Sequence, residues 1–460
     1  MLTFQDLEKY STSEQTRVEF VLRAINEHES TPRFINGKRA GEFFRHHDPE
    51  LEAYVKKIYD MQGNVYDDNV SSNHKLVSNF FYVFIDQAVA YLLGNGVSFD
   101  DPDIKTKLGN DFDYRLMEML TFASCDGESY ALYTGNGIEP FCYACRVSGN
   151  EPYFVPLYDE RDGSLKAGIR YWRLAPDKPL RATLYEPDGF TEYNEDDDKS
   201  LVVMQEKRSY SNVNTSSDIE GVYETESGSS GLPIIRMGYI NDQSALIGNE
   251  AALHAYNMIL SGYVNEVDMN FLYWVLNNCD GMSRQDDVNF IVDLMKSHVL
   301  HLQDGVTADP HQIQIPVEAR EALLERLRKQ LFFDFQAVDV ERVGAGGVTT
   351  VEIRSAYNAL ERKCDHLEKY VGDCIRQLLK VMGLNPDDYP FHFQRARELN
   401  EQEAVQTAIL KAPYIGEEAV TKEILEKSGK IDEYEEIQKQ KAAEAMARMN
   451  MMQEVQTNAE

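Results

Sequence analysis

The hydrophobic and polar positions of this 460-residue chain change their period several times along the sequence. From Leu2 to about Tyr59 the pattern is helical, but Pro32 and Pro49 interrupt it, and Asn36-Gly37-Lys38 is typical of a turn between short helices. This stretch predicts a polar, peripheral helical arm. From about Asn73 to Leu93 the residues are much more apolar and recur on one helical face, which predicts a core helix.

Between Ser129 and about Ile240 the pattern changes to short runs typical of strands. Turns rich in Gly, Pro, Asn and Asp separate these runs, and their spacing predicts an antiparallel β-rich domain. The stretch from Glu186 to Glu226 carries twelve acidic and three basic residues, so we expect its turns to be solvated and mobile. The predicted strands are Tyr130–Tyr133, Phe141–Val147, Tyr153–Leu157, Gly168–Leu174, Arg181–Tyr185 and Leu201–Gln205.

A long helical pattern follows from about Ser244 to Asn277, and at 1.5 Å per residue it predicts a rod of roughly 50 Å. An inserted module comes next. It contains a predicted short helix around Asp286–Lys296 and two predicted strands, Val299–Leu302 and Gln312–Ile315, on either side of a turn at Asp304–Pro310. Because two strands alone are marginal in water, we expect them to pair with something else, most naturally a neighbouring subunit.

A second helix is predicted from Val317 to about Phe335, and Gly344-Ala345-Gly346-Gly347 separates it from a third. The third helix opens with Thr349 and Glu352 at capping-box spacing. Its apolar stripe covers three heptads and predicts packing along its whole length. A short strand, Pro390–Phe393, and a helical tail follow. The stripe residues are Tyr357, Leu360, Cys364, Leu367, Val371, Cys374, Leu378 and Val381.

The composition is that of an ordered protein with an excess of acidic residues. Hydrophobic residues make up 43% of the chain, which is too apolar for disorder, and the length suits two to four domains. The 77 acidic and 46 basic residues give a formal charge of -31. Such a field repels phosphate polymers and disfavours tight nucleic-acid binding, although an acidic surface would let DNA slide past.

Cysteine usage and apolar runs indicate where the protein is made. Six cysteines in so long a chain fit a reducing compartment, so we expect them to be thiols. The first residues carry Asp6 and Glu8 and lack the apolar core of a signal peptide, which predicts synthesis that ends in the cytoplasm. Leu76–Leu93 is interrupted by Asp86, so it predicts a buried helix and no membrane partner.

Candidate metal sites are weak. The single C-x-x-C motif, Cys142 to Cys145, lies in a strand-like run, where structural packing is favoured over a metal or redox role. His298 and His301 would point to opposite faces of a strand, so no metal site is expected there. The acidic clusters at 100–103 and 196–198 lack the spacing of a calcium loop and are interpreted as solvated turns.

Motifs for the common enzyme chemistries are missing from the sequence. It contains no phosphate-binding G-x-x-x-x-G-K-[ST], no G-x-S-x-G and no H-E-x-x-H, so we predict a protein that is not an enzyme and uses no cofactor. The stretch Gly344–Gly347 lacks the third glycine of a dinucleotide-binding loop. It predicts a mobile connector between two long helices.

The order of these parts resembles the portal protein of tailed bacteriophages, in the shorter form common among siphophages. The segment Asn73–Phe99 is similar to the family's asparagine-led helix that ends in a Tyr-Leu-Gly turn. Gly231–Ile235 before the first rod and the Ser355–Leu384 helix also match. The family's serine-glycine step in the preceding loop reads Gly346-Gly347-Val348-Thr349 here. The resemblance extends over about residues 70 to 400.

The resemblance implies an α+β fold with a mixed α/β wing, long stem helices, a small αβ clip and a helical crown. A tunnel loop between the second stem helix and the long wing helix would project into a central channel. The implied ranges are 1–243 and 350–398 for the wing, 244–281 and 317–336 for the stem, 282–316 for the clip, 337–349 for the tunnel loop and 399–460 for the crown.

The resemblance also implies a function. Twelve copies would form a ring at one capsid vertex of the virion, made in the host bacterial cytoplasm, through which a separate terminase drives double-stranded DNA during packaging and DNA leaves at ejection. The implied partners are terminase, a head-completion or adaptor protein, and the major capsid and scaffolding proteins. Two alternatives stay open: a helical scaffold or adaptor assembly protein without a DNA channel, and a metal-dependent hydrolase that uses the acidic clusters.

Three groups of site residues follow from the resemblance. The basic residues of the second rod would balance charge through phosphates or through Glu318, Glu321 and Glu325. The tunnel-loop residues are Arg342, Val343, Gly344, Ala345, Gly346, Gly347 and Val348. The basic stem residues are Arg320, Arg326, Arg328 and Lys329. The clip residues expected between subunits are Val299, Leu300, His301, Leu302, Gln312, Ile313, Gln314 and Ile315.

Overall fold

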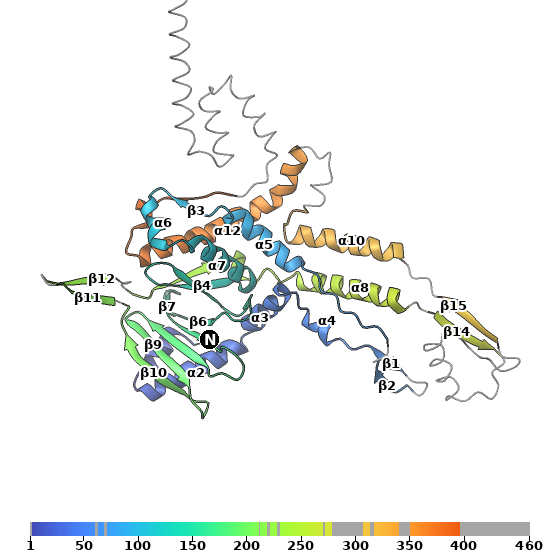
Figure 1. Cartoon of the computed structure of the whole chain (residues 1–460), viewed down its shortest axis with the longest axis horizontal. Helices are drawn as coiled ribbons and strands as arrows, with labels where there is room; N and C mark the ends of the chain where they lie inside the picture. The colour runs from blue at the N-terminus through green and yellow to red at the C-terminus, as the bar shows by residue number, and fades with distance from the viewer. Residues whose placement is uncertain are drawn as a thin grey trace, which may run out of the picture. The chain divides into compact units, whose positions relative to one another are not determined.

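The structure is a computed structural model, and it describes residues 2–59, 63–68, 71–210, 212–218, 221–227, 231–269, 272–277, 307–312, 317–339 and 350–395. Nearly all of these residues belong to one compact unit, Met1–Gly346 with Ser355–Arg395 (Figure 1). Its mixture of helices and sheets agrees with the predicted α+β class. Within the described residues, no helix is long and apolar enough to cross a membrane.

Four helices begin the chain: α1 (Phe4–Tyr10), α2 (Glu14–Ser30), α3 (Pro32–Phe44) and α4 (Pro49–Ala53). The prediction of a peripheral, polar arm was wrong for α1 and α2. Their apolar residues recur at helical spacing and form a core cluster with the sheet, because one face of each helix is apolar. The buried residues of that face are Leu7, Phe20, Val21, Ala24 and Ile25.

The predicted turn at residues 36–38 was also wrong, since these residues lie inside α3. A Cβ atom on Gly37 would collide with the Asp126 carboxylate, and one on Gly41 would collide with the backbone carbonyl of Cys145. Glycine therefore serves the close approach of α3 to its neighbours and not a reversal of the chain.

The β-rich domain is confirmed as a sheet of eight strands in the order β10-β9-β8-β7-β6-β5-β4-β13. Neighbours are antiparallel except β5 and β6, which meet in parallel at Cys142 and Tyr153. The strands are β4 (Glu128–Tyr133), β5 (Ile138–Cys142), β6 (Tyr153–Tyr158), β7 (Leu165–Trp172), β8 (Arg181–Glu186), β9 (Gly189–Glu195), β10 (Leu201–Arg208) and β13 (Ile234–Gly238).

Within its described residues, the acidic stretch 186–226 supplies two further strands of the sheet. Strands β9 and β10 extend the sheet, and along β9 the buried Thr191 and Tyr193 alternate with half-buried Phe190, Glu192 and Asn194. Strands β11 (Asn212–Asp218) and β12 (Gly221–Ser227) form a separate hairpin. A further short hairpin is made by β1 (Lys57–Tyr59) and β2 (Val65–Asp67).

Helices α5 (Phe80–Leu93), α6 (Pro102–Leu108), α7 (Phe112–Asp126) and α12 (Thr350–Val381) share the largest core cluster (Figure 1). The stripe predicted for α12 is confirmed, since its residues from Leu360 to Leu378 are buried. The central helix α7 was not predicted. The predicted strand near residue 391 is confirmed as β16 (Phe391–Phe393), which follows η2 (Pro386–Asp388) and pairs with β3 (Val97–Phe99).

The first predicted rod is shorter than its pattern suggested. After η1 (Ile240–Asp242), α8 covers Glu250–Met269, and Leu272–Asn277 is the strand β14, paired with β15 (Thr307–Gln312). Aromatic and β-branched residues in β14 favour a strand once a partner supplies hydrogen bonds. β15 also occupies much of the predicted turn at 304–310. The second rod is confirmed as α10 (Val317–Asp334).

Several predicted elements lie outside the described residues. They are the helix at 286–296, the strand at 299–302, residues 313–315 of the second strand, and the helical tail from residue 400. The described cysteines are unpaired and buried, in agreement with the thiol prediction, while Cys279 lies outside the described residues.

Candidate functional site

Helices α8 and α10 lie side by side and antiparallel, since Glu266 near the end of α8 forms an ion pair with Arg320 near the start of α10 at 2.6 Å (Figure 1). At the other end, the Phe80 ring of α5 contacts both helices. Its centroid lies 5.0 Å from that of Tyr256 in α8 and 6.0 Å from that of Phe332 in α10. The helix pair is therefore anchored on the helical core at one end.

A strap, residues 73–79, runs along α8 outside any helix or strand. The backbone N–H groups of His74, Leu76 and Ser78 donate to the side chains of Asn265, Ser261 and Asn257 at 2.6, 2.9 and 2.9 Å. In return, the Asn265 amide donates to the His74 carbonyl at 3.1 Å.

The spacing explains this ladder of hydrogen bonds. Four helical residues rise about 6 Å, and two extended residues rise about 6.6 Å, so side chains at i, i+4 and i+8 meet alternate backbone groups. The predicted helix start at Asn73 was wrong because these residues satisfy their backbone groups on α8. Three small polar residues at four-residue intervals in an apolar helix were the signal in the sequence that could have revealed the strap.

Asp48 connects the strap region to the N-terminal helices. Its buried carboxylate accepts the Leu51 N–H at 3.1 Å as the N-cap of α4, and the Asn257 amide donates to it at 3.1 Å. The His254 ring lies 2.9 Å from the same carboxylate. Beyond buried Leu253, the buried line of α8 is thus polar and hydrogen-bonded.

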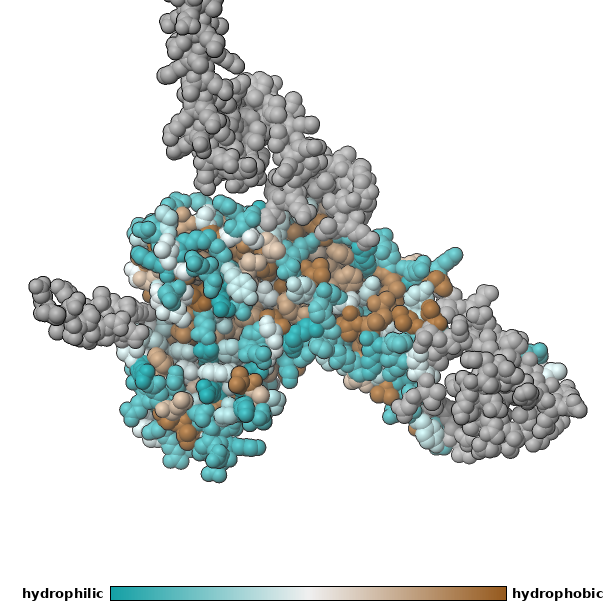
Figure 2. All heavy atoms as spheres, viewed as in Figure 1, coloured by the Kyte–Doolittle hydropathy of each residue, from teal (hydrophilic) through white to brown (hydrophobic). Residues whose placement is uncertain are grey.

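The apolar residues of the helix pair are left partly in solvent. Val267 of α8 is 54% exposed, and Leu323 and Phe333 of α10 are 44% and 78% exposed. Figure 2 shows apolar residues gathered along both helices on the face turned to the viewer. A soluble chain rarely exposes such residues in a row unless another molecule covers them.

The root of the glycine loop, residues 335–339, is held at three points. Phe335 is buried with its ring centroid 4.7 Å from that of Phe84. The Val338 N–H donates to the Gln87 side chain at 2.8 Å, and the Gln87 amide donates back to the Val338 carbonyl at 3.0 Å. Arg328 forms an ion pair with Asp339 at 3.0 Å. The chain is therefore anchored up to Asp339, so the first three residues of the predicted tunnel loop, 337–339, belong to this root.

Lys363 of α12 provides a further contact with the root. Its buried ammonium donates to the Phe335 carbonyl at 3.0 Å, where the end of α10 carries a partial negative charge. Burial lowers the pKa of Lys363 from 10.5 to about 8. Sequence reasoning missed both Gln87 and Lys363, and a polar residue within each apolar helix pattern was the available signal.

Three of the four predicted basic residues of α10 form ion pairs within the chain. Arg320 pairs with Glu266, Arg328 with Asp339, and Lys329 with Glu325 at 3.1 Å. Arg326 is exposed. Of the predicted clip residues, Gln312 ends β15 opposite Leu272. The other clip residues and the predicted tunnel-loop residues 342–348 lie outside the described residues.

Carboxylates of the two acidic clusters accept hydrogen bonds from backbone N–H groups of their own turns. Asp101 caps α6 by accepting the Asp103 N–H at 3.0 Å. Asp196 accepts the N–H groups of Asp198 and Ser200 at 3.0 and 3.1 Å. These contacts agree with the prediction of turns.

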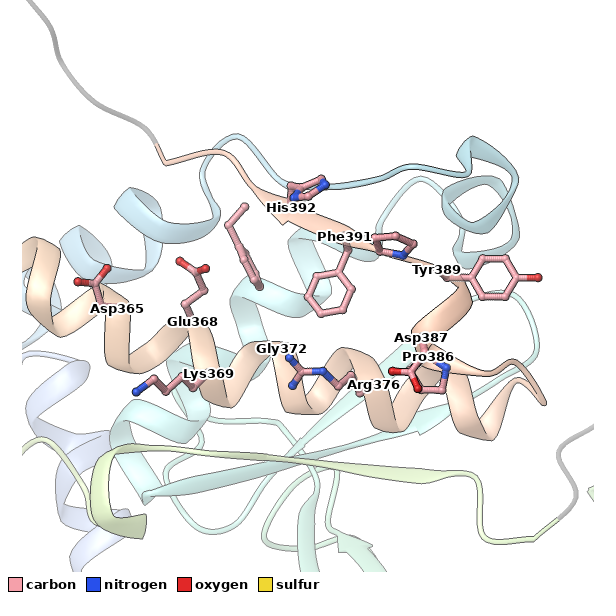
Figure 3. Close-up of a pocket in the computed structure, with 12 residues that line it drawn as sticks. Asp365, Glu368, Lys369, Gly372, Arg376, Pro386, Asp387, Tyr389, Phe391 and His392 are labelled. Carbon is pink, nitrogen blue, oxygen red and sulfur yellow. The ribbon is translucent and has the colours of Figure 1, made fainter.

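A cleft of about 630 Å³ lies between α12 and the segment 386–393 (Figure 3). Figure 3 shows the Asp365 and Glu368 side chains rising from α12 and the Phe391 ring directed toward that helix. Arg395 pairs with both carboxylates at 2.6 Å, and the Arg376 guanidinium lies 5.9 Å from the Phe391 ring centroid. The charges of this cleft are largely matched within the chain, so the helix pair and loop root are the better candidate site.

Comparisons with known proteins identify the family of this chain. The chain is 24% identical to the portal protein of Bacillus phage SPP1 over 418 residues, which cover 85% of the chain and 79% of that protein. It is 24% identical to the portal protein of Clostridium phage phiCD119 over 336 residues, 68% of the chain and 71% of that protein. Residues 41–449 match the family described as phage portal protein, SPP1 Gp6-like, and the chain therefore belongs to this family of phage portal proteins.

Proposed function

We propose that this chain forms a ring at one vertex of a phage capsid, through which double-stranded DNA enters during packaging and leaves at ejection. The exposed apolar side of the α8 and α10 pair supports the proposal most directly, because copies arranged around an axis would cover it. Twelve copies are the expected number. Terminase, a head-completion protein, and the major capsid and scaffolding proteins are the proposed partners.

In this proposal α8 and α10 are the stem, and the sheet with its helices and α12 is the wing. The clip is extended to include β14 and β15, because Leu272–Asn277 pairs with Thr307–Gln312. The clip would then begin near residue 272 instead of 282. Residues 399–460 would form the crown, and residues 299–302 and 312–315 would contact neighbouring subunits.

The proposed tunnel loop is shortened from the predicted 337–349 to residues 340–349, because Gln87, Arg328 and Lys363 hold the preceding residues in place. An anchored root would restrict movement to the loop itself, next to the translocating DNA. The excess of 31 negative charges supports passage without tight binding, because the net field repels phosphates. Among the basic residues of α10, Arg326 has an exposed side chain and would be the most available for contact with DNA or with a neighbouring subunit.

Electron microscopy of the purified full-length chain tests the ring. Negative-stain class averages should show closed rings with a central hole, and counting the subunits would give their number. A strict monomer at high concentration would contradict the proposal. A dimer or an extended rod would favour the alternative of a helical adaptor without a channel.

Shortening the segment Gly344–Gly347 tests the loop separately. Rings should form as in the unaltered protein, while DNA packaging in an assay with the cognate terminase should fall sharply, because the root and the stem contacts are unchanged. Failure of the rings to form would mean that the loop serves assembly and not DNA passage.

A further inference from the structure

Three cysteines and one aspartate meet in the core where α7 ends beside β5. Cys125 and Asp126 are the last residues of α7, while Cys142 ends β5 and Cys145 follows in the next turn. The Sγ atoms of Cys142 and Cys145 and one carboxylate oxygen of Asp126 all lie within 4.8 Å of one another. Each of the four residues is at most 2% exposed. The C-x-x-C spacing in the sequence identified Cys142 and Cys145, and the fold brings the end of α7, with Cys125 and Asp126, to the same region of the core.

The two oxygens of Asp126 differ in their contacts. Oδ2 accepts the backbone N–H groups of Tyr143, Ala144 and Cys145 at 2.9, 2.9 and 3.2 Å, which holds the turn between the two cysteines. Oδ1 is buried and has no hydrogen-bond partner in the described part of the chain. A buried carboxylate oxygen without a donor is unfavourable, and a bound cation would satisfy it.

A fourth donor is available in Cys125, which precedes Asp126 at the end of α7 but lies outside the group of three atoms that are within 4.8 Å of one another. Three sulfur donors and one oxygen donor are a set that suits Zn²⁺, which takes four ligands in a tetrahedral arrangement. Soft thiolates make the set unsuitable for Mg²⁺ or Ca²⁺, since those ions prefer oxygen ligands.

Two arginines contact the backbone of the cluster while their charges are paired with carboxylates, Arg33 with Glu128 and Arg45 with Glu42. The Arg33 side chain donates to the backbone carbonyl of Asp126 at 3.4 Å, and that of Arg45 donates to the carbonyl of Cys145 at 3.1 Å. Such outer contacts orient the residues that bind a metal.

We propose that this chain binds one zinc ion through Asp126, Cys142 and Cys145, and that the Cys125 side chain turns toward the ion as its fourth ligand. Each thiol that binds loses its proton to solvent as its sulfur–zinc bond forms, and no electron is transferred. With four protein ligands the site has no open position, so its role is structural. The ion connects the end of α7 to the turn after β5, on which Gly37 and Gly41 of α3 also pack. The zinc site shares no residue with the α8 and α10 helix pair. A negative result for zinc would therefore not affect the proposed ring, and a negative result for the ring would not affect the zinc site.

Metal analysis of the full-length chain tests the site. The protein is expressed with added zinc, purified without chelators, and its zinc content is measured by mass spectrometry after acid digestion. We expect about one zinc per chain, as for a closed structural site. Cys142→Ser and Cys145→Ser should lose most of this zinc. Cys374→Ser, which alters a buried thiol of α12 outside the cluster, should keep it.

Cobalt substitution keeps the test decisive if the serine variants do not fold. The unaltered chain produced in cobalt-supplemented medium should show thiolate-to-cobalt absorption in the near ultraviolet and the visible bands of tetrahedral Co²⁺. Absence of zinc in the unaltered chain together with absence of these bands would overturn the proposal and leave the cluster as core packing. Equal zinc content in the Cys142→Ser, Cys145→Ser and Cys374→Ser proteins, all folded by circular dichroism, would overturn it as well.

Discussion

Two long helices of this protein bury opposite kinds of residue. α12 turns an apolar stripe inward, and Leu367 and Val371 within it are fully buried by the same chain. α8 buries the amide and hydroxyl groups of Asn257, Ser261 and Asn265 against the strap and leaves Val267 in solvent. One helix is held by apolar packing and the other by hydrogen bonds.

The difference separates the requirements of folding from those of assembly. A stripe that its own chain covers completely, as on α12, contributes to the stability of the single chain. A helix whose buried line is polar is positioned by hydrogen bonds, and its apolar side stays available to a second molecule. Substitutions on the two helices should therefore affect different properties.

The largest effect is expected at the core of α12. Leu367→Asp places a charge without a partner where the side chain is 0% exposed, so the free energy of unfolding should fall by about 4–5 kcal/mol. Urea denaturation followed by circular dichroism would measure the loss. A variant as stable as the unaltered chain would show that α12 does not hold the core.

Phe333→Asp introduces the same side chain on α10, where the native ring is 78% exposed. We expect the single chain to fold with a free energy of unfolding within about 0.5 kcal/mol of the unaltered chain, because no core contact is lost. Rings should be reduced or lost, as measured by analytical ultracentrifugation and microscopy. Normal rings in this variant would place the subunit contact elsewhere.

Lys363→Met tests the buried charge within the otherwise apolar side of α12. The pKa of Lys363 is about 8 in the folded chain and 10.5 as its ordinary value, so between these pH values the unfolded chain holds a proton that the folded chain lacks. Stability should therefore rise with pH across this window by about 3 kcal/mol and stay constant below pH 8, as far as this group is concerned.

Methionine removes both the charge and its pH dependence. Near pH 7 the variant should be more stable by about 2 kcal/mol, because the lost bond to the Phe335 carbonyl, worth about 1 kcal/mol, offsets part of the gain. Denaturation at several pH values between 7 and 10 would measure both effects. An unchanged slope in Lys363→Met would assign the pH dependence to another group.

Asn257→Ala on α8 tests the hydrogen bonds that hold the strap. The change leaves the Ser78 N–H without its acceptor and Asp48 without one donor, which should cost about 1–3 kcal/mol. Asn358→Ala at an exposed position of α12 is the matched control and should change stability by less than about 0.5 kcal/mol. Equal effects in the two variants would mean that the strap is not held by this ladder.

Prediction from the sequence was most successful where a single hydrophobic period continued through a whole helix or strand. The α12 stripe, α10 and most strands of the sheet were predicted because their apolar positions repeat at 3.6 or 2 residues over a whole element. It was wrong at Gly37, at the strap and at β14, where a neighbour in space outweighs local preference. The candidate site was predicted at the level of α10 and its basic residues, while Gln87 and Lys363 were missed.

The sequence by itself determined the main elements, the acidic charge and the resemblance to the portal family, because periodicity, composition and motif order are properties of neighbouring residues. Only the tertiary structure decided that residues 73–79 lie on α8, that Lys363 and Gln87 hold the root of the loop, and that Asp126 meets Cys142 and Cys145. These contacts join residues far apart in the chain, and their hydrogen bonds and burial exist only once the chain has folded.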